Sequence, residues 1–349
     1  YWSVWAANRE FVKNMAYDFA KYGESVGAAG EKVGIFKESQ RDMMEFMQGS
    51  NRTFSAAIMR AVKWGAASKI VYGGWQNVLQ SIDKLAEIET KFAELRMVMS
   101  ILETDFDKIG RSAIKFAKEY GAPVEKVLQA MKIFAQQGLD QAEVIDRTGT
   151  AMLAANISTL SAKDATEALT ASMKVFGTEG EGSIRFLDSW SEVEAKHAIE
   201  AAHMANALKR TAGAAKNAGV NFDELNGIVA GLGSVTRQTG QEIGTSLRFI
   251  FRRLTTEKAP KELATLGIPV VQPSGEYRKG FEILDELASK WRTLNGVQKM
   301  NVAQAIGGTR QYNSVLVMMD NWDEVIRGTT NSMNSKGASE RRNIEIMQV

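Results

Sequence analysis

Two histidines are the side chains of this sequence with the clearest potential for metal binding or acid-base chemistry. His197 and His203 lie six residues apart, in a stretch that we predict to be one helix from about Ile184 to Gly213. A six-residue spacing places two helical side chains on different faces, whereas a metal-binding pair needs a spacing of about four. Glu194 and Glu200 flank His197 but supply no second nitrogen ligand, and the chain has no cysteine. We therefore predict no metal site and no cofactor.

The glycine-rich segments do not have the pattern of a phosphate-binding loop. GAAGEKVG, at 27–34, lacks the four-residue gap and the Lys-Ser/Thr ending of a P-loop. GLGSVTRQTG, at 231–240, follows a predicted helix and not a strand. Asp and Glu are abundant, but no local signature nominates a catalytic pair of carboxylates. The sequence predicts a protein that is not an enzyme.

One basic cluster is a candidate contact patch. Its members are Arg248, Arg252, Arg253, Lys258 and Lys261. A cluster of this kind suits an acidic partner surface or DNA, and the alternative is an ordinary solvated helix face. The whole chain gives no such indication, because 43 basic residues nearly balance 41 acidic ones.

The composition predicts an all-α protein, a multi-helix bundle built from capped helical hairpins. The 349 residues are 44% hydrophobic, which is enough for a core, and only four are proline. No run approaches the roughly 18 consecutive apolar residues that span a bilayer. The opening YWSVWAANREF has neither an initiator Met nor the pattern of a signal peptide, so we expect a piece of a longer protein.

The stretch 221–254 is predicted to form a helical hairpin. Asn221 with Glu224, and Thr239 with Glu242, each have the spacing of a capping box at the start of an apolar helical stripe. Glycines at the end of the first helix and the start of the second permit a tight turn and close backbone approach. The four-residue spacing of Gly227 and Gly231 resembles a small-residue helix contact, which we interpret as close helix packing in water.

A longer periodic pattern runs through residues 75–118, which we predict to form one long helix. Apolar residues recur there at alternating spacings of three and four, the pattern of a heptad seam. The seam consists of Leu85, Ile88, Phe92, Leu95, Met99, Leu102, Phe106 and Ile109. Two interpretations remain open: a parallel coiled coil between copies of the chain, with a trimer favoured, or one helix packed inside its own bundle.

The rest of the chain predicts shorter helices. Pro123, Asp140 and Ser161 have the types expected at helix starts. The segment 268–278 contains two prolines and a β-branched run, which favours one short extended segment or β-hairpin. A Gly-Gly pair at 307–308 is expected to separate two of the last helices.

Five of these segments, taken in order, resemble a known family. They are AGVNFDE (218–224), GQEIGTSLR (240–248), KELATLGI (261–268), GFEILDEL (280–287) and AIGGTR (305–310). Their order is similar to the core region of phage tail tape measure proteins. The resemblance spans Leu85 to Ile326, and the region before Leu85 matches little.

The resemblance and the helical pattern together suggest four segments. We expect an N-terminal helical segment at 1–74, the heptad-patterned helix at 75–118, a tape measure core domain at 119–326, and a C-terminal helix or linker at 327–349.

The resemblance implies a structural virion protein, made in the host cytoplasm, that sits in the lumen of the tail tube or at the tail tip. Such a protein sets tail length during assembly and is released when the genome is ejected. The implied partners are further copies of the chain, the tail tube protein, hub proteins of the tail tip or baseplate, tail assembly chaperones and, after ejection, the host membrane.

Because the helices predicted here begin and end every few turns, we expect the compact part of such a protein and not its extended measuring rod. Two alternative functions remain open at this point: a cytoplasmic helical adaptor or scaffold with no role in the tail, and a membrane-active segment used during DNA delivery.

Overall fold

The computed structural model describes residues 76–99, 103–177, 182–256 and 258–348, with side chains from Glu87 in the first helix and from Lys108 in the second. The chain divides into two units, Tyr1–Val78 and Leu79–Val349, and the description below concerns the second. The helical segment predicted for residues 1–74 lies outside the described residues.

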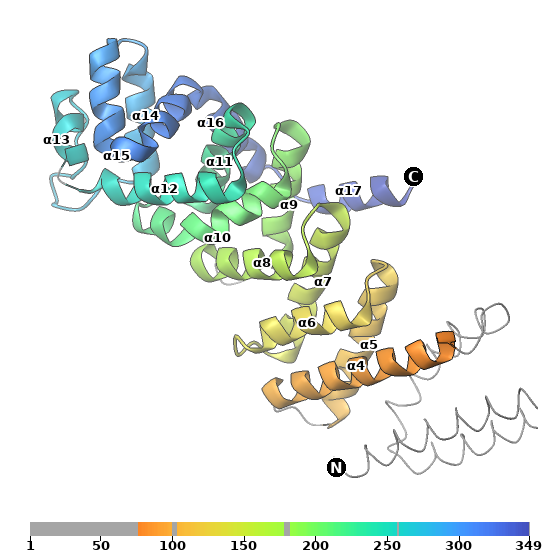
Figure 1. The fold of residues 1–349 in the computed structure, drawn as a ribbon. Helices are drawn as coiled ribbons and strands as arrows, with labels where there is room; N and C mark the ends of the chain where they lie inside the picture. Colours follow the sequence, from red (N-terminus) through yellow and green to blue (C-terminus); the bar gives the residue numbers. More distant parts are fainter. Residues whose placement is uncertain (1–75, 100–102, 178–181, 257, 349) are drawn as a thin grey trace, which may run out of the picture. The chain divides into compact units, whose positions relative to one another are not determined.

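The described part of the chain is all-α, as predicted (Figure 1). Its fourteen helices are α4 (Gln76–Met99), α5 (Glu103–Glu119), α6 (Val124–Ala135), α7 (Gln141–Ile157), α8 (Ala162–Phe176), α9 (Ile184–Lys196), α10 (Ala201–Asn217), α11 (Phe222–Thr236), α12 (Gly240–Leu254), α13 (Lys258–Thr265), α14 (Gly280–Trp291), α15 (Gly296–Asp320), α16 (Trp322–Met333) and α17 (Ala338–Met347). Within these residues the extended structure is one isolated antiparallel bridge between Val271 and Tyr277.

Of the stretch 75–118, predicted as one helix, the structure describes α4 and α5, and residues 100–102 lie outside the described residues. The sequence from Leu85 to Ile109 contains no glycine or proline that would mark a helix end. A three-and-four spacing of apolar residues arises equally from one long helix and from two consecutive helices that each bury a stripe. The periodicity predicted buried positions in both α4 and α5, among them Leu95 and Ile109.

The single helix predicted from Ile184 to Gly213 is wrong, because the chain forms α9 and α10 there. His197 ends α9 in an extended conformation (φ −126°, ψ 151°). The linker carries Ile199 into the core, where its Cδ1 atom lies against the backbone of Gly233 in α11. The carbonyl oxygen of Ala198 accepts a hydrogen bond from Arg237 Nη1 at 3.1 Å. Tertiary packing, and not a local stop signal, ends this helix.

The hairpin of α11 and α12 begins each helix with a capping box. Asn221 Oδ1 accepts from the backbone N–H of Glu224 at 2.9 Å, and Glu224 Oε2 accepts from the backbone N–H of Asn221 at 2.8 Å. Thr239 and Glu242 form the same reciprocal pair at α12. The left-handed residue after α11 is Arg237 (φ 57°) and not a glycine.

The glycines of α11 permit a close helix crossing. α11 and α16 lie side by side (Figure 1), with Gly227 of α11 facing Gly328 of α16. A Cβ atom at Gly328 would lie 3.0 Å from the Cα of Gly227, and one at Gly231 would lie 2.6 Å from Val325 Cγ2. The Gly227–Gly231 spacing thus serves packing between two helices of one chain.

A buried polar network ties α9, α11 and α16 together. Asn226 Nδ2 donates to Ser189 Oγ at 2.7 Å and to Ser332 Oγ at 3.1 Å. The hydroxyl of Ser332 donates its proton to Asp223. In the hydrogen bond between the hydroxyls of Ser189 and Ser332, Ser189 is therefore the donor. Asp223 also receives two hydrogen bonds from Arg185 at 2.7 and 2.8 Å. Asn226 Nδ2, Ser189 and Ser332 all donate within this path, whereas Asn226 Oδ1 is buried without a partner, and these hydrogen bonds link the three helices.

The last helix is held by a carboxylate on α9. Asp188 is 5% exposed and accepts hydrogen bonds from the backbone N–H groups of Gly337 (2.8 Å) and Ser339 (3.0 Å) and from the Ser339 hydroxyl. These donors lie at the N-terminus of α17, where free N–H groups favour an anion. This contact holds the N-terminus of α17, and ion pairs of Arg341 with Glu192 (3.1 Å) and of Arg342 with Glu194 (2.6 Å) join the rest of the helix to α9.

A kink shapes α15. Gly308 adopts φ 66° and ψ −171° inside this element, so two helical segments meet at an angle there. The predicted break at 307–308 is confirmed. Arg253 of α12 lies beside this kink and donates from Nε to the carbonyl oxygen of Ala305 at 3.2 Å.

Candidate functional site

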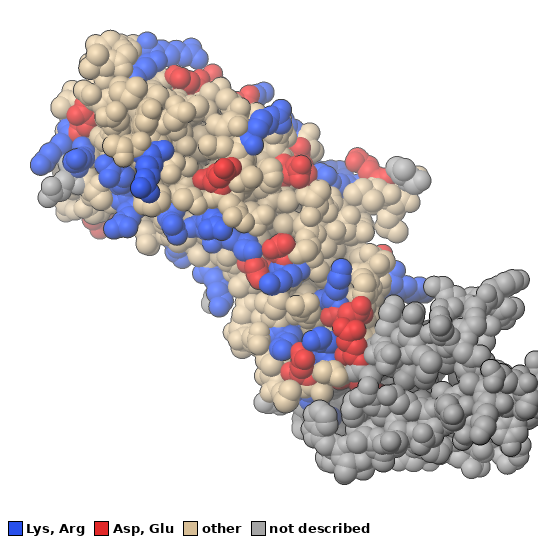
Figure 2. All heavy atoms as spheres, in the orientation of Figure 1, with Lys and Arg blue, Asp and Glu red and all other residues tan. Residues whose placement is uncertain are grey.

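The predicted basic cluster lies mainly on the surface of α12 and α13. Arg248, Arg252, Lys258 and Lys261 are exposed, whereas Arg253 is half-buried against α15. Figure 2 shows Lys and Arg gathered over α12 and along α10. Four members of the cluster are therefore available to a partner, and the fifth has a structural role.

The fold adds two arginines that sequence proximity did not reveal. Arg210 of α10 lies beside Gly244 of α12, since a Cβ there would be 3.0 Å from Arg210 Cβ. Arg310 follows the α15 kink, and its neighbour Gln311 accepts from Ser246 of α12 at 2.6 Å. Both arginines are exposed. We call the six residues the basic face: Arg210, Arg248, Arg252, Lys258, Lys261 and Arg310.

The heptad seam divides between α4 and α5. Leu95 and Ile109 are fully buried and Phe92 is 3% exposed, while Ile88 and Met99 are half-buried. The side chains of the other three members, Leu85, Leu102 and Phe106, lie outside those described. Glu94 of α4 pairs with Lys132 of α6 at 2.9 Å, and hydrogen bonds from Lys132 and Lys91 lower the pKa of this carboxyl. Burial within one chain is what the single-bundle interpretation predicts.

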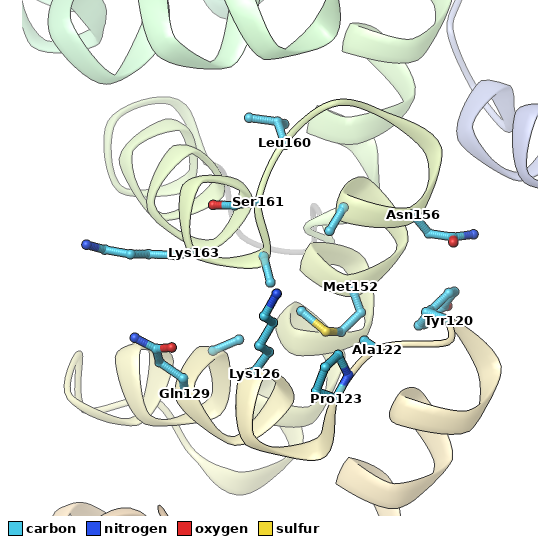
Figure 3. A pocket seen from close by; sticks show the side chains of 13 residues that line it. Tyr120, Ala122, Pro123, Lys126, Gln129, Met152, Asn156, Leu160, Ser161 and Lys163 are labelled. Atoms are coloured by element: carbon cyan, nitrogen blue, oxygen red, sulfur yellow. The ribbon is translucent and has the colours of Figure 1, made fainter.

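A cavity of about 370 Å³ lies between α6 and the α7–α8 pair (Figure 3). Pro123, Met152 and Leu160 form apolar parts of its lining, and Lys126 reaches into the space while Lys163 points away. Burial, reinforced by the neighbouring carboxylate of Glu119, raises the pKa of Tyr120 in the lining to about 12. The phenol is therefore neutral near pH 7. The lining residues include no Asp or Glu that could form an acid-base pair with Tyr120 or the lysines.

The two histidines lie on different elements. His197 is the C-cap of α9 and His203 is in the first turn of α10. His197 Nε2 lies 2.9 Å from Asn331 Nδ2 and its Nδ1 lies 3.3 Å from Glu324 Oε2. Within the described ranges, no group of three or more His, Cys, Asp and Glu side chains has a metal-binding arrangement.

Burial lowers the pKa of His197, and the cations of Arg327 and Lys196 lower it further. The Glu324 carboxylate opposes this shift, but it also pairs with Arg327, and the His197 side chain is only 2% exposed, so burial dominates. Because the unfolded chain, with a pKa near 6.5, binds the proton more readily, the stability contributed by neutral His197 is present above about pH 6.5. It is lost as pH falls from there toward the folded pKa.

We therefore expect the urea midpoint to decrease when the pH is lowered from 7.5 to about 5.5. The decrease should be smaller in His197→Gln than in the unmodified chain. His203→Gln is the matched control and should keep the full dependence on His197. The measurement is urea unfolding followed by circular dichroism, with the imidazole signals titrated by NMR. A His197 signal that titrates above 6.5 would contradict the expected sign.

Similarity to known proteins covers the same region of the chain. The profile of the family described as "Phage-related minor tail protein" matches residues 110–308, more than half of the chain. The chain belongs to this family. The match includes α6 to α14, and therefore the α11–α12 hairpin and most of the basic face.

A curated relative of this minor tail protein is the "Tape measure protein" of Pneumococcus phage Dp-1. It is 23% identical over 256 residues, which cover 71% of this chain and 22% of the relative. The chain thus spans about a fifth of that protein's length. No solved structure matches. These families are structural and not enzymatic, and they confirm the resemblance to tape measure proteins.

Proposed function

We propose that this chain is the compact helical part of a phage tail tape measure protein. In this proposal it resides in the tail lumen or at the tail tip, anchors the protein there during assembly, and leaves when the genome is ejected. The length-setting rod lies in the remainder of the protein. Family membership supports a structural role in the phage tail, and the tape measure relative supports the specific assignment.

One observation carries the distinction between anchor and rod. Among the described residues the longest helix, α15, has 25 residues and is itself kinked at Gly308. At 1.5 Å per residue such a helix spans only about 37 Å. The helices also pack across long sequence separations, as in the contact between α11 and α16. Removing residues from a packed domain disrupts its core, whereas removing residues from a rod shortens it.

Deletions in the phage gene test this proposal. Removing residues 221–254, the α11–α12 hairpin, should abolish tail formation because it removes the partners of α10 and α16. A deletion of equal length in a helical rod elsewhere in the protein should give intact tails shorter by about 50 Å. Tail lengths are measured by electron microscopy of purified particles. Viable tails shortened in proportion by the 221–254 deletion would contradict the proposal.

The proposed partners are the tail tube protein, hub proteins of the tip or baseplate, tail assembly chaperones and further copies of the chain. For self-association, a trimer measured by light scattering would support an intermolecular seam in α4 and α5. A monomer would leave Leu95 and Ile109 as core residues of a single bundle, as their burial favours.

The alternative functions are less well supported. Membership of a minor tail protein family argues against a cytoplasmic adaptor, and recovery of the chain in purified particles tests this directly. A membrane-active role would be detected as leakage from liposomes. In the part of the chain that the structure describes, no helix combines the length and apolar character needed to cross a bilayer.

A further inference from the structure

We propose that the basic face binds the phosphate backbone of double-stranded DNA, without reading its sequence. This inference rests on the surface of α10, α12, α13 and α15 and is independent of whether the protein sets tail length. It assigns the candidate patch one ligand and extends it by the two arginines that only the fold brings into place.

The cations of the basic face are not neutralised by the protein. None of the six residues forms an ion pair within the described chain, whereas Arg185, Lys209 and Arg278 elsewhere are each paired with a carboxylate at 2.5–2.8 Å. The nearest carboxylates in sequence are those of Glu242, Glu257 and Glu262, three against the six cations of the basic face. Glu242 accepts from the backbone and hydroxyl of Thr239, which lower its pKa. A surplus of positive charge is left on this surface.

Four helices bring this charge together. Arg248 and Arg252 lie one turn apart on α12, about 6 Å along its axis. α10 packs closely against α12 because Gly244 of α12 has no side chain. A Cβ atom at Gly244 would lie only 2.6 Å from the carbonyl oxygen of Ala207 in α10. α13 and the kinked α15 pack on each other and on the other end of α12.

Helix stability alone does not explain this distribution. The macrodipole favours cations at a helix C-terminus, which accounts for Arg252 near the end of α12. Lys258 and Lys261 lie in the first turn of α13, where the same dipole disfavours positive charge. Arg210 and Arg310 extend the patch onto other helices. The two lysines of α13 thus occupy positions that helix stability disfavours, which is consistent with a role in binding an anionic ligand.

The chemistry of the patch favours duplex DNA among anionic ligands. Guanidinium groups match phosphate in bidentate geometry, and four of the six residues of the basic face are arginine. Single-stranded sites stack successive bases on several aromatic side chains. In the basic face the exposed aromatic is Phe249, which is 42% exposed and lies 5.8 Å from the Arg248 guanidinium. One ring is too few for a stacking platform, so backbone contacts dominate.

Fluorescence anisotropy with a labelled 30-base-pair duplex and the full chain tests the proposal. Affinity should fall steeply between 50 and 200 mM NaCl because phosphate binding releases counterions. The double variant Arg248→Glu, Arg252→Glu should bind roughly tenfold or more weakly, with the salt slope reduced by about two. The matched control, Arg292→Glu with Lys336→Glu, changes the net charge equally at exposed positions outside the basic face and should stay within about twofold.

Several results would overturn the assignment. Absence of binding at 50 mM NaCl, or an equal loss in both double variants, would show that the basic face has no specific part in DNA binding. Displacement of the duplex by poly-glutamate at equal charge concentration would indicate an acidic protein as the partner. If single-stranded DNA binds more tightly than the duplex, and Phe249→Ala abolishes that binding, the ligand of the basic face is single-stranded DNA and not duplex DNA. Circular dichroism of each variant verifies that it is folded.

Discussion

Gly227→Ala is expected to lower the free energy of unfolding by about 3 kcal/mol, even though alanine is the better helix former. The new methyl group would meet two backbone atoms of α16, the carbonyl oxygen of Val325 and the amide nitrogen of Thr329 at 2.6 Å, and also the side-chain hydroxyl of Thr329. Backbone atoms cannot rotate away, so α11 and α16 would have to separate and lose contacts along their length. The measurement is the urea midpoint followed by circular dichroism.

Gly213→Ala is the matched control for this prediction. Gly213 lies inside α10, is exposed, and has no atom within 4 Å of the position of an added Cβ. The same substitution should there raise stability by up to about 1 kcal/mol through helix propensity. If the two variants shift the midpoint in the same direction, the close α11–α16 crossing is wrong.

Asp188→Ala is expected to cost about 3 kcal/mol and to release α17. The substitution removes an acceptor of three hydrogen bonds and leaves the buried N–H and hydroxyl of Ser339 without a partner. Stability is measured by urea unfolding, and the release of α17 by hydrogen exchange of residues 338–347. Exchange there should accelerate by more than elsewhere in the chain, because α17 has few apolar contacts of its own.

The exposed ion pair of Asp323 and Arg292 supplies the control. Its side chains are 91% and 89% exposed and lie 3.5 Å apart. Asp323→Ala should change stability by no more than about 0.5 kcal/mol, since solvent screens such pairs. An effect of Asp188→Ala as small as that of the control would contradict the anchoring role of this carboxylate.

Local signals in the sequence predicted the helix starts well. The capping boxes at Asn221 and Thr239, and the N-caps Asp140 and Ser161, all occur as the residue types indicated. Each depends on a hydrogen bond to a backbone N–H only a few residues away, so the pattern and its physical cause lie in the same short stretch. The break at Gly308 was visible for the same reason, since glycine adopts a positive φ readily.

The break after Lys196 had no such local cause. It depends on Ile199 packing against Gly233, a contact between segments more than thirty residues apart. The basic face was found only in part for the same reason. Arg248 and Arg252 are neighbours on one helix, but Arg210 and Arg310 join them only through the packing of α10 and α15 on α12.

The crossing of α11 and α16 has a consequence for synthesis. Gly227 and its partner Gly328 are separated by roughly 100 residues, which a ribosome adds in about 5–20 s. During that interval the apolar surface of α11 has no α16 to cover it. A nascent chain that ends at residue 321 should therefore remain sensitive to protease and bind a hydrophobic dye, whereas a chain extended through residue 348 should lose both properties. Such a delay gives a cotranslational chaperone a defined surface, and a defined time, in which to act.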